Sequence, residues 1–384
     1  MTRSILFVDH AEGLGGAERS LLLLMRHLDP SRWQPHLATV HGSLAKAATS
    51  LNFPVHILPM PQLRRSPLAL IQGWSTSSEL AQISRQINAI ALHSNTVRAA
   101  FFTAAAAKLA RKPFIWHYRD FWLSETKPAH RWIDLLLTRL LCRVSDIVLA
   151  NSQAVRAKLP CQEKGLVVHN GIETAHFSSW DSSTLTFRQQ LGIPPQTAVI
   201  GMVGRLRPWK GQRNFLQMAK GIHKQNPNTH FLIVGGNPFE AKDDYANELR
   251  QLARELGLET AVSFLGQLDD VRPALAAMDI FVHPGEPEPF GLVNIEAMAM
   301  GKPVVAWAHG ALPDFVQHQD TGILVPHHLD MWPLFTASIL NLVADPEKAK
   351  RMGEAGRQRV KAKFDIRQTA VRVAEIYEQH ILPT

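Results

Sequence analysis

The chain has 384 residues, of which 46% are hydrophobic and 19% charged; this predicts about two folded domains and excludes a disordered chain. Its 41 Lys and Arg against 33 Asp and Glu give a formal net charge of +8. The whole excess lies between Met1 and Thr184, where 20 basic residues stand against 12 acidic ones. Either this half has an anionic partner, or it carries a solvated basic surface.

Two cysteines, Cys142 and Cys161, argue against a disulfide framework and fit a reducing compartment. The apolar run near the N-terminus is too short for a secretory signal, and no run reaches the roughly 18 apolar residues of a spanning helix. We therefore expect a cytoplasmic protein, either soluble or peripheral at the inner face of the plasma membrane.

Short apolar runs alternate with helical patterns through the first half of the chain. The predicted strands are Ile5–Val8, Leu37–Val40, Val55–Leu58, Ala89–His93, Phe114–His117, Ile147–Ala150 and Leu166–His169. The predicted helices are Glu18–His27, Leu44–Leu51, Glu79–Ile87, Thr96–Leu109 and Trp132–Val144. This alternation predicts a parallel, doubly wound sheet.

A polar stretch rich in Ser and Thr, Asn170–Phe187, predicts a linker, after which the alternation restarts. The second set of strands is Ala198–Val203, His230–Val234, Val262–Leu265, Ile280–His283, Val304–Trp307 and Ile323–Val325. The helices between and after them are Gln212–Lys224, Tyr245–Leu256, Val293–Met300, Pro333–Val343, Glu347–Lys363 and Ile366–Ile381. The sequence thus predicts an α/β protein with two Rossmann-like domains and a cleft between them.

A glycine-rich loop, AEGLGGAE, follows the first strand and opens a helix. Glycines let the backbone approach a ligand, and a helix N-terminus offers unpaired N–H groups to an anion. A dinucleotide fingerprint fits poorly, because Glu18 stands at the third glycine position and no acidic residue ends the second strand. A purely structural turn and a loop that faces a diphosphate, with Gly15 and Gly16 as contacts, both stay open.

Two cations follow the first strand of the second half, in GMVGRLRPWKG. Arg205 and Lys210 lie on either side of a turn set by Pro208, so a glycine-bounded loop can bring both to one point. Two cations at the carboxyl end of a strand can neutralise a departing diphosphate, although both could also be ordinary exposed charges. The sequence has no Asp-x-Asp pair and no Cys/His cluster at zinc spacing, so we expect no metal and no cofactor.

The stretch HPGEPEPFGLVNIEAMAMGKPVVA resembles the E-x7-E signature of glycosyltransferase family 4, retaining enzymes of the GT-B fold (glycosyl transferases group 1). Three further segments, GGAE, HNGIETAHF and GRLRPWKG, resemble the same family. The resemblance implies three parts: an acceptor-binding domain over 1–180, a nucleotide-sugar-binding domain over 181–365, and a C-terminal helix over 366–384 that packs back on the first domain.

The resemblance also implies roles for individual residues of the second half. Glu296 would accept hydrogen bonds from the ribose hydroxyls, and Glu288 would contact hydroxyls of the donor sugar. The additional glutamate, Glu286, does not have the E-x7-E spacing to Glu296, whereas Glu288 does. Further contacts to sugar, phosphate and base would come from Phe290, Gly291, Leu292, Gln267 and Leu268, largely through backbone groups. The Gly310–Asp314 loop matches the family weakly.

By the same resemblance, His117 faces the reacting sugar. Asp120, three residues later, could contact either the acceptor or the donor, and we take it as an acceptor-binding candidate. His117 could equally be a satisfied core histidine. The expected catalytic set is His117, Glu288, Arg205 and Lys210.

The implied function is metal-independent, retaining transfer of a hexose-like sugar from a UDP- or GDP-sugar to a saccharide or lipid-linked acceptor, as in cell-envelope polysaccharide synthesis. Two basic segments with apolar residues, Gln62–Trp74 and Arg131–Arg143, could rest on an anionic membrane, although the second could also be a core helix with a basic outer face. The alternatives are an epimerase of the same fold and a catalytically silent saccharide-binding protein. Nothing in the sequence indicates nucleic-acid binding apart from its basic pI.

Overall fold

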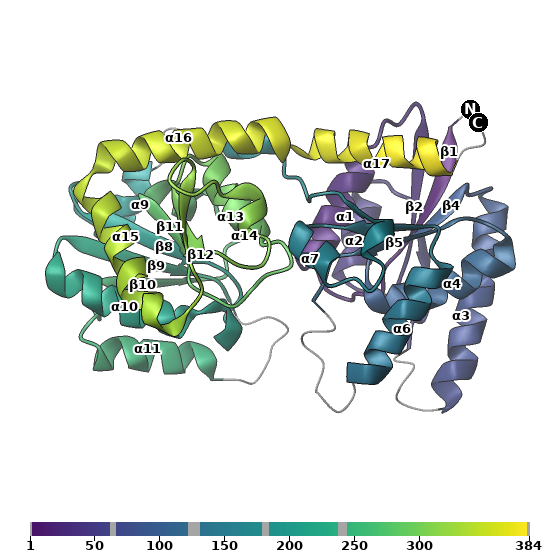
Figure 1. The fold of residues 1–384 in the computed structure, drawn as a ribbon, viewed down its shortest axis with the longest axis horizontal. Coiled ribbons are helices and arrows are strands. Elements are labelled where there is room, and N and C mark those ends of the chain that lie inside the picture. The colour runs from purple at the N-terminus through teal and green to yellow at the C-terminus, as the bar shows by residue number, and fades with distance from the viewer. Residues whose placement is uncertain (1, 62–66, 122–130, 179–183, 237–243, 382–384) are drawn as a thin grey trace. The chain divides into compact units, whose positions relative to one another are not determined.

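The computed structural model describes residues 2–61, 67–121, 131–178, 184–236 and 244–381. The chain forms two compact units, each with one all-parallel sheet (Figure 1). Unit 1 comprises Met1–Ile172 and Ile366–Thr384, and unit 2 comprises Glu173–Asp365. The fold class predicted from the alternation of strands and helices is confirmed.

Unit 1 has a seven-stranded sheet in the order β3-β2-β1-β4-β5-β6-β7. Its strands are β1 (Arg3–Val8), β2 (Trp33–Thr39), β3 (Val55–Ile57), β4 (Ala91–Ser94), β5 (Phe114–Tyr118), β6 (Ile147–Ala150) and β7 (Gly165–Val167). Its helices are α1 (Gly16–His27), α2 (Ser43–Ser50), α3 (Pro67–Gln86), α4 (Val97–Ala110), α6 (Arg131–Val144), α7 (Gln153–Ala157) and α17 (Ile366–His380). Each of the seven predicted strands is present.

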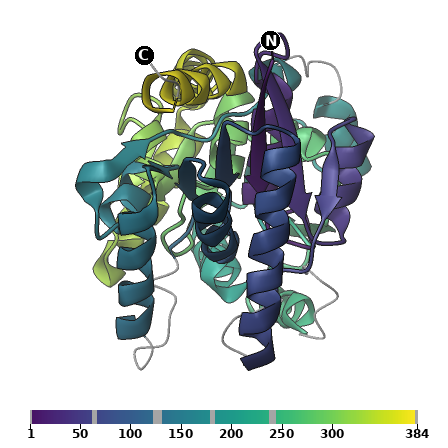
Figure 2. The ribbon, with the colours of Figure 1, turned by 90° about the vertical axis from the view of Figure 1, so that its right-hand side faces the viewer.

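The strands of unit 1 are apolar at successive positions because both faces of the sheet are covered. Ile5 and Phe7 of β1 point into a core shared with α1, α2 and α17, whereas Leu6 and Val8 point into a core shared with α3, α4 and α6. On the second face α4 packs between α3 and α6 (Figure 2).

The C-terminal helix α17 belongs to unit 1 although it follows the whole of unit 2. Its first residue, Ile366, donates its N–H to the carbonyl of Ile172 at 2.9 Å, and Thr369 Oγ1 donates to the carbonyl of His169 at 3.1 Å. Val373 and Tyr377 are fully buried against the α1 side of the sheet. The end of the chain is therefore part of the unit 1 core.

Unit 2 has a six-stranded sheet in the order β10-β9-β8-β11-β12-β13. Its strands are β8 (Ala198–Val203), β9 (Thr229–Val234), β10 (Val262–Gly266), β11 (Ile280–His283), β12 (Val304–Trp307) and β13 (Gly322–Val325). Its helices are α8 (Thr174–Ser178), α9 (Thr184–Gln190), α10 (Gln212–Gln225), α11 (Tyr245–Glu255), α12 (Arg272–Ala277), α13 (Leu292–Ala299), α14 (Leu312–Phe315), α15 (Trp332–Ala344) and α16 (Pro346–Lys363).

Helices differ from the prediction more than strands do. Helix α3 begins at Pro67, not at Glu79. The hydroxyls of its Ser and Thr residues are satisfied inside the helix, since Thr76 and Ser77 each donate back to the carbonyl four residues earlier, at 2.9 Å. The predicted linker Asn170–Phe187 contains α8 and the start of α9, and the short α12 was not predicted.

Cys142 of α6 and Cys161, just before β7, form a disulfide, with Cα atoms 6.0 Å apart. The expectation that the two cysteines are not part of a disulfide framework is therefore wrong for this pair. The sequence count could not reveal it, because the pairing depends on α6 ending beside the segment that leads into β7.

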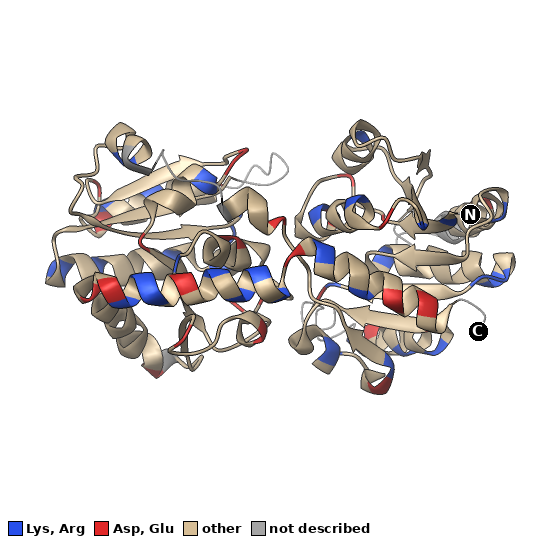
Figure 3. Ribbon diagram, turned by 90° about the horizontal axis from the view of Figure 1, so that it is seen from above, with Lys and Arg blue, Asp and Glu red and all other residues tan. Residues whose placement is uncertain are grey.

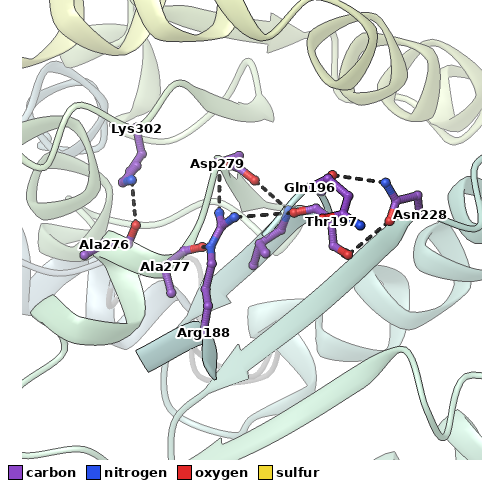
Figure 4. Close-up of polar contacts among 9 residues, drawn as sticks. Arg188, Gln196, Thr197, Asn228, Ala276, Ala277, Asp279 and Lys302 are labelled. Carbon is purple, nitrogen blue, oxygen red and sulfur yellow. Dashed lines mark hydrogen bonds and ion pairs between the residues drawn. The ribbon is translucent and has the colours of Figure 1, made fainter. Parts of the chain in front are cut away.

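A polar cluster secures the amino ends of the unit 2 strands (Figure 4). Arg188 of α9 donates to the carbonyl of Ala277 at 2.8 Å and to Asp279 at 2.8 Å, while Asp279 accepts the N–H of Val199 at 2.7 Å. Nearby, Lys302 Nζ donates to the carbonyl of Ala276 at 2.8 Å, and burial lowers the pKa of Lys302 to about 8. The cluster ties α9, α12, β8 and β11 together at the edge opposite the strands' carboxyl ends.

Across the part of the chain that the structure describes, no helix combines the length and apolarity needed to span a bilayer.

Replacement Arg188→Leu should destabilise unit 2 by about 2–4 kcal/mol, because the buried carbonyl of Ala277 and the carboxylate of Asp279 lose their shared donor. Differential scanning calorimetry would measure the loss. The matched control is Arg351→Leu, since Arg351 is exposed on α16. Equal melting temperatures for the two variants would contradict this role of Arg188.

Candidate active site

The centre of the unit 2 site is the point between β8 and β11 where the strand order reverses direction. Ligands of doubly wound sheets bind at the carboxyl ends of the strands at such a point. The loop after β8 carries Arg205 and Lys210, and the loop after β11 carries Glu286 and Glu288. The two predicted groups of site residues therefore meet at the expected edge of the sheet.

Two facing glycines let these loops pack backbone against backbone. A Cβ on Gly211, which has φ +83°, would lie 2.6 Å from the carbonyl oxygen of Pro284, and one on Gly285 would lie 2.7 Å from that of Lys210. The N–H of Glu286 donates to the carbonyl of Trp209 at 2.7 Å. Larger residues at either glycine would push the loops apart, so glycine is what places Lys210 beside the second loop.

Lys210 and Glu288 form an ion pair with side chains only 11% and 6% exposed. His283 at the end of β11 completes the group, with Nε2 3.4 Å from Glu288 Oε1. Burial by itself would raise the pKa of Glu288, but Lys210 and His283 outweigh it, so the pKa is lowered. Burial also lowers the pKa of His283 to about 4. At neutral pH the group thus holds a carboxylate, an ammonium and a neutral imidazole.

Arg205 stands at the open side of this group. Its side chain is exposed, and its positive charge contributes to the lowered pKa of Glu288. Its carbonyl accepts a hydrogen bond from Gln212 Nε2 at 2.9 Å, which fixes the backbone of the loop. The site thus combines an exposed guanidinium with a buried Lys210–Glu288 pair.

Helix α13 begins directly after the second loop. Gly291 precedes its first residue, and Asn294 Nδ2 donates to the carbonyl of Gly291 at 3.0 Å. The N–H groups of Leu292 and Val293, the first two residues of the helix, have no acceptor within it and can bind an anion. Phe290 is buried against Phe315, whereas Glu296 lies partly exposed one turn further along the helix.

The structure separates the two glutamates that precede Phe290. Glu286 is exposed, while Glu288 is buried. The Gly310–Asp314 loop supports Glu288: the N–H of Ala311 donates to the Glu288 carbonyl at 3.0 Å, and a Cβ on Gly310 would lie 2.6 Å from that oxygen. This loop, which matched the family only weakly, thus packs on the backbone of Glu288.

Gln267 and Leu268 follow β10 at the same edge of the sheet, on the far side of β9. The loop after β9 fixes Gly266, the residue that precedes them, because the N–H of Gly235 donates to the carbonyl of Gly266 at 2.8 Å. Gln267 is exposed. Of the residues predicted in this half, Lys210 and Glu288 touch, and the others lie on neighbouring loops or on α13.

Unit 1 gathers its polar residues at the corresponding point, the carboxyl ends of β1, β4 and β5. His10 Nδ1 lies 2.6 Å from Thr96 Oγ1, and Asn95 Nδ2 donates to Asp9 Oδ2 at 2.7 Å, so the loops after β1 and β4 are joined. Burial, followed by the nearby carboxylate of Glu18, raises the pKa of Asp9 to about 7.

The predicted glycine loop opens α1 at Gly16. The N–H of Gly15 is already taken, since it donates to Glu18 Oε2 at 2.8 Å. The N–H groups of Gly16 and Ala17 belong to the first turn of α1 and have no acceptor within the helix. Any anion at this loop would therefore bind next to the Glu18 carboxylate rather than at Gly15.

Arg119, which was not among the predicted site residues, is the centre of the unit 1 cluster. Its Nε donates to Asn95 Oδ1 at 2.8 Å, its Nη1 donates to Asn170 Oδ1, and its Nη2 lies 3.2 Å from His117 Nδ1. It is buried, and burial lowers its pKa to about 10. The guanidinium therefore joins the ends of β4 and β5 to the segment after β7.

His117 is buried at the end of β5, and burial, then Arg119, hold its pKa well below the usual 6.5. Besides Arg119 it contacts His93, whose Nε2 lies 3.2 Å from His117 Nδ1. Asp120 is partly exposed; burial raises its pKa, and it accepts the N–H of its neighbour Phe121 at 2.7 Å.

Asn170 lies within HNGIETAHF, which the family resemblance singled out, and Arg119 lies between the predicted residues His117 and Asp120, so their neighbours carried the signal that could have found them. His93 and Tyr377 had no such signal, because their contact joins residues 284 positions apart. Within the described ranges, no three His, Cys, Asp or Glu side chains are grouped so as to hold a metal ion.

Comparison with known proteins agrees with this arrangement. The family model for glycosyl transferases group 1 matches residues 183–359, and the model for glycosyltransferase family 4 matches residues 14–176. The chain belongs to glycosyltransferase family 4. The family identification and the enzyme class predicted from the E-x7-E stretch are confirmed.

Two relatives show the range of similarity to curated members of family 4. The D-inositol 3-phosphate glycosyltransferase of Corynebacterium glutamicum is 35% identical over 52% of this chain and 48% of its own length. The alpha-maltose-1-phosphate synthase of Mycolicibacterium smegmatis is 27% identical over 84% of this chain and 86% of its own length. The chain thus spans about half the length of the first relative and most of the second.

Solved structures of similar fold include the Anabaena protein HepE. Its complex with UDP is 27% identical, with a TM-score of 0.84 over 98% of this chain and all of HepE, and its complex with UDP-glucose gives a TM-score of 0.80. The sucrose-phosphate synthase of Thermosynechococcus elongatus, at 21% identity, has a TM-score of 0.80 and shares the fold. The GT-B prediction is confirmed.

Proposed function

We propose that this family 4 member is a retaining glycosyltransferase that moves a sugar from a UDP-sugar to a hydroxyl of a saccharide or lipid-linked acceptor without a metal ion. The observation that carries the proposal is the unit 2 site, where Arg205, a buried Lys210–Glu288 pair and the first turn of α13 meet at the carboxyl edge of the sheet. Cations and free amides at one point suit a diphosphate.

The uridine base is proposed because HepE, similar over almost its whole length, was crystallised with UDP and with UDP-glucose. Glu296 accepts hydrogen bonds from the ribose hydroxyls, since a vicinal diol offers two donors to two carboxylate oxygens. Gln267 and Leu268 line the base through backbone groups. Glu288, held ionised beside Lys210, accepts from hydroxyls of the donor sugar.

In the reaction, the bond between the anomeric carbon and the diphosphate oxygen breaks, and a bond from the acceptor oxygen to that carbon forms. The acceptor proton passes to the departing diphosphate, and attack from the face it leaves retains configuration. Arg205 and Lys210 stabilise the charge that builds on the diphosphate, which is the main electrostatic demand of the step. In unit 1, Gly16 and the loop after β1 approach the phosphates, His117 faces the reacting sugar, and Asp120 contacts the acceptor.

Calorimetry with UDP, and release of UDP from UDP-glucose with and without EDTA, would test the proposal. Glu296→Gln should weaken UDP binding at least about tenfold through the lost ribose contacts, and EDTA should leave release unchanged. Glu347→Gln, an exposed glutamate on α16, is the control. Unchanged affinity in Glu296→Gln would remove its role; UDP binding without turnover of any UDP- or GDP-sugar would indicate a silent binding protein.

Unit 1 also carries the charge and the apolar surface expected of a protein that meets an anionic membrane. It holds 22 Lys and Arg against 12 Asp and Glu, whereas unit 2 holds 19 against 21 (Figure 3). On α6, apolar side chains four residues apart are exposed: Trp132 (63%), Leu136 (53%), Leu140 (52%) and Val144 (45%). A spacing of four places them on one face of the helix.

Basic residues share this face, because Arg139 and Arg143 of α6 are exposed among the apolar side chains. Ile71 and Trp74 of α3 are exposed as well. Residues 62–66 of the other basic segment lie outside the described residues. We propose that this face of α6 rests on anionic lipid, which brings unit 1 to a lipid-linked acceptor.

Sedimentation with phosphatidylglycerol–phosphatidylcholine vesicles would test the membrane contact. Binding should occur at low salt and fall at high salt, and Arg139→Glu/Arg143→Glu should weaken it at least about tenfold, because each basic residue contributes about 1 kcal/mol. Arg351→Glu on α16 is the control for charge alone. Absence of binding at low salt, or equal loss in both variants, would contradict the proposal.

A further inference from the structure

Three buried side chains from three separate elements form a chain of contacts that ends at His117. Tyr377 Oη of α17 lies 2.7 Å from His93 Nδ1 of β4, and His93 Nε2 lies 3.2 Å from His117 Nδ1 of β5. Tyr377 and His93 are fully buried, and His117 is 1% exposed. A hydroxyl and two imidazoles in an apolar core are costly unless each hydrogen has an acceptor.

Arg119 determines which atoms donate and which accept in the contacts among Tyr377, His93 and His117. A guanidinium can only donate, so the contact between Arg119 Nη2 and His117 Nδ1, at 3.2 Å, makes that nitrogen an acceptor. Burial, followed by the charge of Arg119, lowers the pKa of His117 well below its usual value, so the ring is neutral. A neutral imidazole that accepts at Nδ1 carries its hydrogen on Nε2.

The same logic sets the remaining hydrogens. His93 Nε2 faces the accepting Nδ1 of His117, so it donates, which makes His93 Nδ1 the acceptor of the Tyr377 hydroxyl hydrogen. His93 is also neutral, with a pKa lowered to about 3 by burial. The hydrogens between α17 and β5 are therefore directed toward His117 Nδ1, whose single lone pair is shared by the donors His93 Nε2 and Arg119 Nη2.

The other ring nitrogen of His117 has no partner among the side chains of this contact series. His117 Nε2 is buried and makes no hydrogen bond among the described residues. An N–H left without an acceptor inside a protein lowers stability, and such a group is retained where a ligand supplies the acceptor. It lies at the carboxyl end of β5, beside the point where the strand order of unit 1 reverses.

We propose that Tyr377 and His93 are positioning residues for His117: together with Arg119, they hold the His117 ring in the form that presents Nε2–H to an oxygen of the bound donor sugar. The identity of that oxygen rests on the proposed function. Which nitrogen of His117 carries the hydrogen does not depend on the proposed function. The last helix of the chain, α17, thereby supplies part of the site in unit 1.

Replacement Tyr377→Phe is the first test, since it removes only the hydroxyl and keeps the ring that packs against Trp33. Turnover of UDP-glucose should fall by about tenfold to a hundredfold, the range for outer partners of a working histidine, with a smaller change in KM. Tyr245→Phe, a buried tyrosine of unit 2, is the matched control. Equal turnover in the two variants would contradict the role of the Tyr377 hydroxyl.

Replacements of His93 separate positioning from packing. In His93→Gln the amide can donate to His117 Nδ1 and accept from Tyr377, so activity should be largely kept. In His93→Phe the apolar ring suits the core but cannot hold the hydrogen, so activity should fall as in Tyr377→Phe while the melting temperature stays near that of the wild type. Equal activity in His93→Phe and His93→Gln would overturn the proposal.

A readout independent of turnover is the ¹⁵N NMR spectrum of histidine-labelled protein, with His93→Gln and His117→Gln used to assign the two rings. The wild type should show the hydrogen on Nε2 of both His117 and His93. In Tyr377→Phe the hydroxyl no longer donates to His93 Nδ1, so His93 should show a mixture of the two tautomers. An unchanged spectrum in Tyr377→Phe would refute the positioning role. If instead His117→Gln kept full turnover, the proposed function of His117 would be wrong. The spectrum would still test the hydrogen bonds among Tyr377, His93 and His117.

Discussion

The site of unit 2 depends on one buried ion pair, between Lys210 and Glu288. The pair joins the loops after β8 and β11, and it can form only because Gly211 and Gly285 let those loops touch. Removing either partner would leave a buried charge without compensation, so the two charges are retained together. The consequence is a fixed ammonium on the same loop as the exposed Arg205, at the edge of the sheet where ligands of this architecture bind.

In unit 1, the polar cluster at the carboxyl ends of the strands is centred on a different basic side chain. A buried guanidinium, Arg119, binds Asn95 and Asn170 and reaches His117, so the ends of three strand-to-helix connections are held by one cation. Helix α17 adds the hydroxyl of Tyr377 to this cluster after the chain has built the whole of unit 2. In each unit, a buried basic side chain thus contacts the loops at the carboxyl ends of the strands: Lys210 in unit 2 and Arg119 in unit 1.

The sequence could predict the sheets because their strands are continuous apolar runs between turn residues, and that signal is local. It could also indicate Glu288, Arg205 and Lys210 as candidate site residues, since these lie in short motifs. It could not predict that Lys210 and Glu288 pair, because the pairing requires two loops 78 residues apart to pack through their backbones. Nor could it predict Cys142–Cys161 or the contact of Tyr377 with the site, since both arise from packing between elements distant in the chain.

The central claim is that the Lys210–Glu288 site binds a diphosphate through its cation. The most direct measurement compares the affinities of UDP and UMP, by calorimetry, for the wild type and for Lys210→Met/Glu288→Gln, which removes both charges and leaves no unpaired carboxylate buried. The dissociation constant for UDP should rise at least about tenfold, and that for UMP should change less than about twofold. Equal changes for the two ligands, or no change for UDP, would contradict the account.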